Sequence, residues 1–376
     1  MATLFPVPIS KPFDPSTLKI EVRNTTVSAL CEMLKNDFID LQPDFQRHAD
    51  LWNKKEKSCL IESIILGIPL PSFYFYKDEK AKRWVVIDGL QRLCSLRDFM
   101  VEKKMKLEGL ELLADTHEGL MFEDFSFYDQ VEMVMRTVTL NIIMGDSLQE
   151  AKYTIFQRIN SKGTPLQPAE IRNALFHGKS MDLVKKLAQS ECFKEATLNG
   201  VSEKRLLHFD FVARFIAFYL QGYEAYQNIR QLRKGSKMAN DTTMDIYIGN
   251  ALETLNGVDD EKVFVELEAV FYRSLTLCHA LLDNQVFSNP RRDNRREKIS
   301  ITLFEATMCA VANLTKAEAN LMIERKDTFR RHYEELFYNE RFLRALSNGT
   351  NQYVSVKTRF ECLASIVIKT LNDTDK

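Results

Sequence analysis

Residues 84–93 constrain the fold of this chain more than any other stretch, because they predict a strand, a tight turn and a helix in immediate succession. Four large apolar residues at 84–87, three of them β-branched, end abruptly at Asp88 and Gly89. Apolar residues then recur at helical spacing over 93–100, which predicts an amphipathic helix from about residue 90 onward. The sequence therefore predicts a strand-to-helix junction at residues 88–92.

Three polar side chains lie at this predicted junction, those of Asp88, Gln91 and Arg92. The first N–H groups of a helix lack intrahelical acceptors and the helix dipole is positive there, so the junction favours a bound anion. Arg92 would add a bidentate grip on a phosphate. The alternative is structural: Asp88 is then only a turn residue, and Arg92 only pairs with a nearby carboxylate.

Length and composition indicate a globular protein of two domains. The 376 residues suffice for two domains of ordinary size, and 45% hydrophobic with 27% charged residues predicts a sizeable core. The formal net charge of -1 excludes a generally basic protein, so any contact with nucleic acid must come from a local patch.

The chain shows no pattern of a metal site, a signal peptide or a membrane span. Its seven cysteines are scattered without a C-x-x-C pair, which argues against a zinc ribbon or disulfide framework and is typical of a reducing cytosol. No apolar run approaches the ~18–20 residues of a membrane span, and the longest, 209–220, contains Asp210 and Arg214. We therefore expect a cytoplasmic protein with no membrane contact and no metal-ligand cluster.

The hydrophobic periodicity divides the chain into two parts. Proline-rich residues 1–20 predict an extended arm, Thr26 predicts a helix N-cap, and almost every periodic segment from Pro168 onward is helical. Residues 103–126 have no clear pattern. The ranges that predict strands are 72–76, 83–87 and 137–144, and those that predict helices are 54–66 and 148–159. We therefore expect an α+β fold with an α/β domain at 1–165 and an all-helical domain at 166–376.

Four short sequence phrases follow one another along the first part of the chain. They are Pro-Asp-Phe-Gln-Arg at 43–47 with Trp52, Glu-Ser-Ile at 62–64 with Gly-Ile-Pro at 67–69, Asp-Gly-Leu-Gln-Arg at 88–92, and Phe-Gln-Arg-Ile-Asn at 156–160 with Gly-Thr-Pro-Leu at 163–166. Together they resemble the N-terminal domain of GmrSD-type modification-dependent restriction proteins, which carry an Asp-Gly-Gln-Gln-Arg motif. The resemblance covers about the first 180 residues and extends loosely to Ser-Asn-Gly-Thr at 347–350.

The resemblance implies a small ParB/sulfiredoxin-like α/β domain that binds, and often hydrolyses, a nucleoside triphosphate with Mg²⁺ as part of a DNA-defence system. Asp88, Gln91 and Arg92 would then be catalytic. Leu90 stands where the family usually has its first glutamine, and if that glutamine positions a water or a base edge, its loss weakens hydrolysis and spares binding. The implied nucleotide-binding residues are Gln46, Arg47, Gly89, Arg158, Asn160 and Lys162. For the phrase at 156–160 a structural reading is equally open, in which its apolar residues are a buried helix face and Asn160 ends that helix. No G-x-x-x-x-G-K-[S/T] sequence occurs, so this is not a P-loop protein.

Partners follow from the same resemblance. A dense basic stretch in the helical half would contact DNA phosphates, although acidic residues interrupt it and an exposed charged loop is the alternative reading. Its residues are Arg291, Arg292, Arg295 and Arg296. The six histidines are far apart, so we expect no nuclease of the His-Asn-His type here and leave cleavage to a separately encoded nuclease. The rival readings are a non-catalytic nucleotide or DNA binding module and a helical protein-interaction scaffold.

Overall fold

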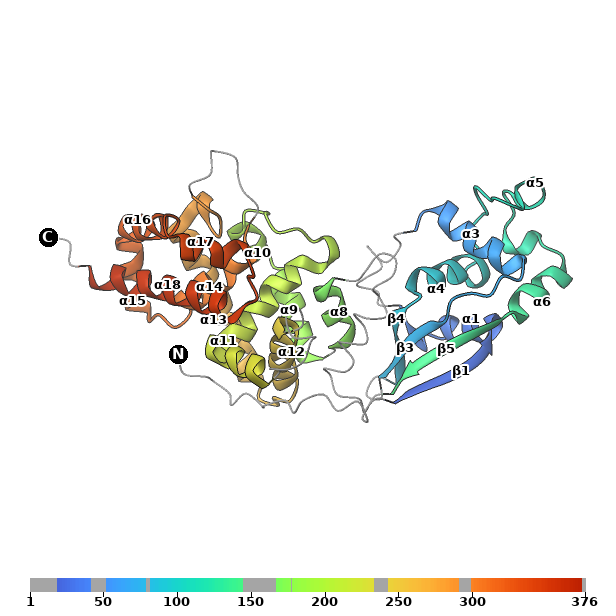
Figure 1. The fold of residues 1–376 in the computed structure, drawn as a ribbon, viewed down its shortest axis with the longest axis horizontal. Coiled ribbons are helices and arrows are strands. Elements are labelled where there is room, and N and C mark those ends of the chain that lie inside the picture. Colours follow the sequence, from blue (N-terminus) through green and yellow to red (C-terminus); the bar gives the residue numbers. More distant parts are fainter. Residues whose placement is uncertain are drawn as a thin grey trace. The chain divides into compact units, whose positions relative to one another are not determined.

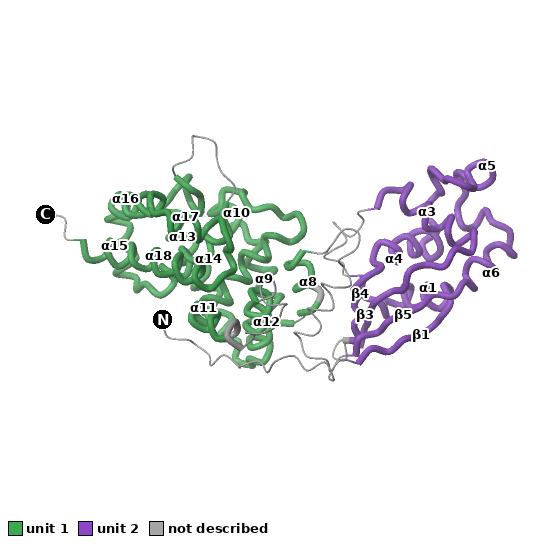
Figure 2. Tube along the Cα trace, viewed as in Figure 1, with its two compact units in different colours: residues 1–12, 167–376 green, residues 13–166 purple. Residues whose placement is uncertain are grey.

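The computed structural model describes residues 19–41, 52–78, 82–144, 167–176, 178–232, 243–290 and 299–373. The chain divides into two compact units (Figure 2). We call residues 13–166 the α/β unit, and residues 1–12 together with 167–376 the helical unit. All five strands of the described sheet lie in the α/β unit (Figure 1), so the expected α+β fold class is confirmed.

A five-stranded sheet in the order β1-β5-β3-β4-β2 forms the centre of the α/β unit. The strands β3 and β4 form an antiparallel hairpin, whereas β5 runs parallel to β3 and antiparallel to β1. The short β2 pairs in parallel with β4. The strand bounds are β1 (Ile20–Thr26), β2 (Ile39–Asp40), β3 (Phe73–Asp78), β4 (Arg83–Asp88) and β5 (Thr137–Ile143). The three strands predicted from the sequence are β3, β4 and β5.

Helices of the α/β unit share one hydrophobic core with this sheet. The hydroxyl of Thr26 accepts the Ala29 N–H at 3.3 Å, which confirms the predicted N-cap of α1. Helix α3 begins with a reciprocal capping box between Asn53 and Glu56, and Gly67, whose φ is +73°, follows its end. The helix bounds are α1 (Val27–Lys35), α3 (Lys54–Ile65), α4 (Leu90–Leu96), α5 (Ala114–His117) and α6 (Phe127–Met135).

Helix α4 continues directly into a π-helical turn at Arg97–Val101. The predicted apolar stripe of this segment is buried, since Leu93, Leu96 and Phe99 are all 0% exposed. They belong to the cluster that also contains residues of the strands, α1, α3 and α6. The junction at 88–92 is therefore fixed from both sides, by the sheet before it and by a core helix after it.

The helical unit is built around α11 (Leu207–Leu232), which packs against α9, α12, α14 and α18 (Figure 1). The other helices of this unit are α8 (Pro168–Leu175), α9 (Lys179–Ala188), α10 (Glu191–Ala196), α12 (Thr243–Asn256), α13 (Glu261–Leu282), α14 (Ile301–Val311), α15 (Lys316–Glu324), α16 (Lys326–Leu336), α17 (Glu340–Ser347) and α18 (Tyr353–Asn372). Across the described ranges, none of the helices combines the length and the hydropathy that crossing a bilayer requires.

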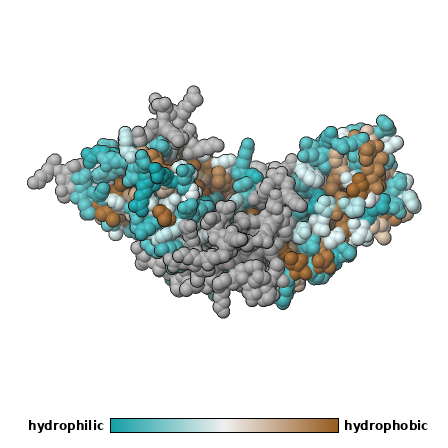
Figure 3. Space-filling model, in the orientation of Figure 1, coloured by the Kyte–Doolittle hydropathy of each residue, from teal (hydrophilic) through white to brown (hydrophobic). Residues whose placement is uncertain are grey.

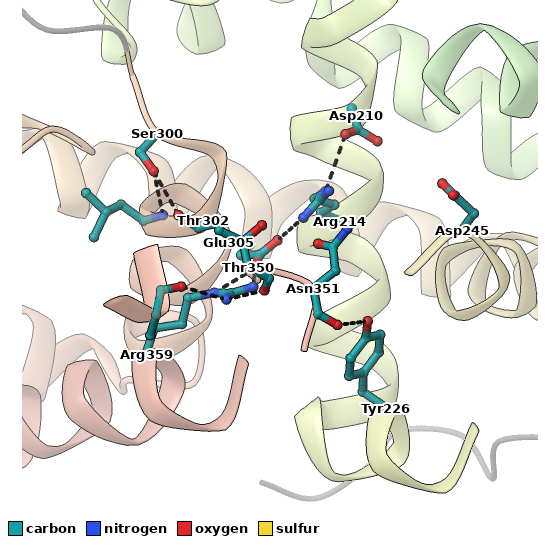
Figure 4. A network of polar contacts seen from close by, with 12 residues as sticks. Asp210, Arg214, Tyr226, Asp245, Ser300, Thr302, Glu305, Thr350, Asn351 and Arg359 are labelled. Atoms are coloured by element: carbon teal, nitrogen blue, oxygen red, sulfur yellow. Dashed lines mark hydrogen bonds and ion pairs between the residues drawn. The ribbon is translucent and has the colours of Figure 1, made fainter. Parts of the chain in front are cut away.

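A buried chain of alternating charges crosses the helical unit (Figure 4). Arg214 of α11 contacts both Asp210 and Glu305, at 3.3 and 3.2 Å, and Glu305 also accepts from Arg359, which is 0% exposed. At the other end, Asp210 and Asp245 share Arg172. These six residues come from α8, α11, α12, α14 and α18, so one neutral network ties five helices together.

The Ser-Asn-Gly-Thr phrase at 347–350 begins with the last residue of α17 and continues into the loop before α18. Arg359 donates to the carbonyl oxygen of Thr350 at 2.6 Å, and the hydroxyl of Tyr226 donates to that of Asn351 at 2.5 Å. The described contacts of this phrase are therefore those of a loop anchored on the buried network.

Candidate functional site

The strand-to-helix junction depends on a left-handed glycine. Gly89 has φ of +101° and ψ of 9° and lies at the N-cap position of α4, between the end of β4 and Leu90. A Cβ atom added there would lie 2.5 Å from Cδ1 of Phe73 on the neighbouring strand β3. Both the backbone conformation and the packing therefore require glycine at this position.

Arg92 is the buried centre of the junction. It is 8% exposed, and its guanidinium stacks over the Phe73 ring at 4.6 Å. One terminal nitrogen donates to Asp88 at 2.9 Å and to the carbonyl of Ser72 at 3.3 Å, and the other donates to the carbonyl of Pro71. Burial lowers the pKa of Arg92 below its ordinary value, and Asp88 opposes this shift; arginine remains charged at neutral pH nevertheless.

This arrangement contains the Arg92–Asp88 pair that the structural alternative predicts. It also leaves the Asp88 side chain 34% exposed, so the carboxylate reaches solvent while its partner does not. The Arg92 guanidinium therefore binds Asp88 and the backbone carbonyls before β3, and it does not lie open to solvent.

Gln91 connects the junction to the phrase that ends at Trp52. Its Oε1 accepts the backbone N–H of Trp52 at 3.2 Å. Trp52 closes the phrase that begins at residue 43, so two of the four phrases meet at the start of α4. Gln46 and Arg47 of that phrase lie outside the described residues.

Glu62, from the phrase at 62–64, has a structural role. Its carboxylate, 5% exposed, accepts the backbone N–H groups of Glu111, Leu112 and Leu113 at 2.7–3.2 Å. Burial alone would raise the pKa of Glu62, but these three donors hold it below its ordinary value. Glu62 thereby fixes the segment ahead of α5 onto α3.

The structure thus brings together Asp88, Gly89, Gln91 and Arg92 and adds contacts that the sequence did not predict. These are the Phe73 ring, the carbonyls of residues 71 and 72 and the N–H of Trp52. No local pattern signals them, because they lie about 20 residues or more away along the chain. The other predicted nucleotide-binding and DNA-binding residues, Arg158, Asn160, Lys162, Arg291, Arg292, Arg295 and Arg296, lie outside the described residues.

The part of the chain that the structure describes contains no group of three or more His, Cys, Asp or Glu side chains placed to hold a metal ion. The seven cysteines, all of which lie within the described ranges, form no disulfide bonds. Within the described residues, Asp88 is the carboxylate that the Asp88–Arg92 junction itself contains.

Fold and site together define a small α/β domain whose polar turn is assembled around a buried arginine, joined to a helical unit. Residues 28–177 match the family model described as GmrSD restriction endonuclease, N-terminal domain. This match confirms the resemblance drawn from the four phrases, and it associates the matched part of the chain with a restriction system. No curated protein and no solved structure matches the chain.

Replacing Gly89 by Ala should lower the free energy of unfolding of the α/β unit by about 2–3 kcal/mol, because left-handed strain and the clash with Phe73 add. Gly119→Ala is the matched control: its φ is +82°, but no atom lies within 4 Å of the added Cβ. This control should lose only about 1 kcal/mol. Urea denaturation of both variants measures the difference, and equal losses would show that the Phe73 contact is unimportant.

Proposed function

We propose that the α/β unit binds a nucleoside triphosphate with Mg²⁺ at the Asp88–Arg92 junction, as the nucleotide-dependent component of a restriction system. The observation that carries this proposal is a carboxylate, Asp88, held partly exposed beside a helix start that has no side-chain cap. Gly89 supplies no acceptor for the first N–H groups of α4. Such N–H groups are suited to phosphate oxygens.

Each residue of the junction then has a separate role. Asp88 would contribute an oxygen ligand to Mg²⁺ that the phosphates also hold, which is how proteins usually bind this ion with nucleotides. Arg92 is a positioning residue, because its hydrogen bonds orient Asp88 and the backbone before β3. Gln91 positions Trp52 and with it the end of the phrase at 43–52.

Binding without turnover is the second candidate function, and Leu90 is the observation that favours it. An aliphatic side chain at this position cannot orient a water molecule by hydrogen bonding. Phosphoryl transfer to water depends on such positioning. Under this alternative the nucleotide acts as a switch, and modified DNA and a separately encoded nuclease are the partners that such a component would serve.

Thermal unfolding of the full chain with each nucleoside triphosphate and Mg²⁺ tests the proposal. A ligand at 100 times its dissociation constant stabilises the native state by about 2.7 kcal/mol, so one nucleotide should raise the melting temperature clearly. Asp88→Asn should abolish the rise, and Asp115→Asn, an exposed aspartate of α5, should keep it. Arg92→Ala should also lose the rise, measured against its own ligand-free melting temperature.

Two results would contradict the proposal. A rise that Asp88→Asn leaves intact would place the ligand elsewhere in the chain. No rise with any nucleotide would leave the helical scaffold as the better reading. Where a rise is seen, release of inorganic phosphate distinguishes hydrolysis from binding alone.

A further inference from the structure

Helix α6 presents its apolar stripe to solvent instead of to the core. Phe127 is 82% exposed, Tyr128 71%, Val131 39% and Met135 59%. At about 100° per residue these four side chains fall within a stripe about 100° wide, which is the width of the buried face of an ordinary amphipathic helix. The opposite side of α6 packs inward through Met133, which is 2% exposed. The helix therefore has a second apolar face that the described chain does not cover.

Neighbouring residues extend this face. Leu66 and Ile68, which follow α3, are 40% and 50% exposed. The glycine between them lies against Arg136, the residue after α6, since a Cβ at Gly67 would be 3.1 Å from the Arg136 Cζ. Hydrophobic surface is visible on the α/β unit in Figure 3. The exposed Phe127 and Tyr128 rings together contribute on the order of 300 Å² of apolar surface that is in contact with water. This area is comparable to the largest apolar patch on a typical monomer, which is often functional.

The charge around this face is mainly negative. Residues 107–135 contain eight Asp and Glu and no Lys or Arg. Arg136, at the end of the face, pairs with Glu132 at 3.8 Å, and Glu108 and Glu123 pair with Lys54 and Lys103, so the remaining acidic residues leave a negative balance. Within α6, Glu132 is 50% exposed, and Asp129 is exposed as well. A nucleic acid or an anionic lipid surface would be repelled by such a field. A second copy of the same face would place acidic residues against acidic residues, which disfavours self-association.

We infer that the outer face of α6, with Leu66 and Ile68, docks a basic amphipathic segment of another protein. The apolar stripe offers the contact area for the apolar side of such a segment, and the acidic rim selects Lys and Arg beside it. This inference concerns a surface distinct from the residues of the Asp88–Arg92 junction and does not depend on nucleotide binding.

Two labelled peptides of about 18 residues, long enough to form a helix, provide the test: one amphipathic Leu/Lys peptide and its Leu/Glu counterpart. Fluorescence anisotropy with the full chain should show saturable binding of the Leu/Lys peptide, weakened by salt, and at least tenfold weaker binding of the Leu/Glu peptide. Tyr128→Ser should weaken the Leu/Lys complex about tenfold, because exposed aromatic anchors dominate such contacts.

Tyr338→Ser is the matched control, because Tyr338 in the helical unit is 70% exposed and Tyr128 is 71% exposed. The control should leave peptide binding unchanged, and neither variant should shift the melting temperature. Equal binding of the two peptides, or equal loss in the two variants, would overturn the inference. Sedimentation velocity of the chain alone adds a further outcome: a dimer that Tyr128→Ser dissociates would identify a second copy as the occupant and also overturn it.

Discussion

Replacing Glu305 by Gln should lower the free energy of unfolding of the helical unit by about 3–5 kcal/mol, because a buried ion pair that loses one partner leaves an uncompensated charge. Glu305 is 0% exposed and accepts from both Arg359 and Arg214. Arg214 keeps Asp210 in the variant. Arg359 would keep its hydrogen bonds to the carbonyl oxygens of Ala345 and Thr350.

The control for this prediction is another Glu–Arg pair in the same unit. Glu340 contacts Arg344 at 3.1 Å, but the two side chains are 84% and 75% exposed. Solvent screens such pairs, so Glu340→Gln should leave stability almost unchanged. Urea denaturation measures both variants, and hydrogen exchange in α14 and α18 localises the loss. If the two variants lose the same stability, the buried network does not hold these helices together.

Local periodicity was sufficient to predict much of the α/β unit. The strands β3, β4 and β5 and the helices α1, α3 and α4 were predicted because their apolar residues repeat at the period of the structure they form. The strand β1 was missed, since Ile20 and Val22 are exposed at the edge of the sheet and the strand forms only by pairing with β5. Two-residue β2 gives too short a pattern to recognise.

Residues 103–126 show no periodic pattern from which a helix or strand can be predicted, and the physical reason differs from that for β1 and β2. Much of this segment is held by carboxylates that accept backbone N–H groups, instead of by a periodic apolar face. Glu118 accepts the N–H groups of Gly109 and Leu110, and Glu62 accepts three more from about 50 residues away. Pairings of this kind leave no local signature in the sequence.

The candidate site was predicted only in part. The sequence predicts the junction and its four polar or glycine positions. It leaves open whether Arg92 grips a phosphate or pairs with a nearby carboxylate, and the structure shows the pair with Asp88. The stacking on Phe73 and the carbonyl acceptors before β3 were not predictable, because they belong to the neighbouring strand. In the same way, Asp210 and Arg214 appear in the sequence only as interruptions of an apolar run, whereas their partners Arg172 and Glu305 lie on two other helices, α8 and α14.

The stability of the α/β unit should depend on one buried aspartate, Asp98, about as strongly as that of the helical unit depends on Glu305. Lys57 donates to Asp98 at 2.7 Å with both side chains 7% exposed, and Arg97 donates to the same carboxylate at 2.9 and 3.0 Å. Asp98→Asn should therefore cost about 3–5 kcal/mol at neutral pH, because it removes the negative charge that faces the buried Lys57 ammonium. Lys57→Met should cost less, since Asp98 keeps Arg97.

The ionisation of the Asp98 carboxylate makes the stability loss of Asp98→Asn depend on pH. Burial would raise the pKa of Asp98, but Lys57 and Arg97 hold it below its ordinary value. A lowered folded-state pKa means that the ionised group stabilises the fold fully above its unfolded pKa of about 3.9, and that this contribution disappears as the pH falls below it. The gap in unfolding free energy between wild type and Asp98→Asn should therefore be constant from neutral pH to about pH 5 and narrow below about pH 4. Urea denaturation across this range measures the gap; a gap that stays constant down to about pH 2 would mean that the charge of Asp98 contributes nothing, and that the loss comes from altered packing.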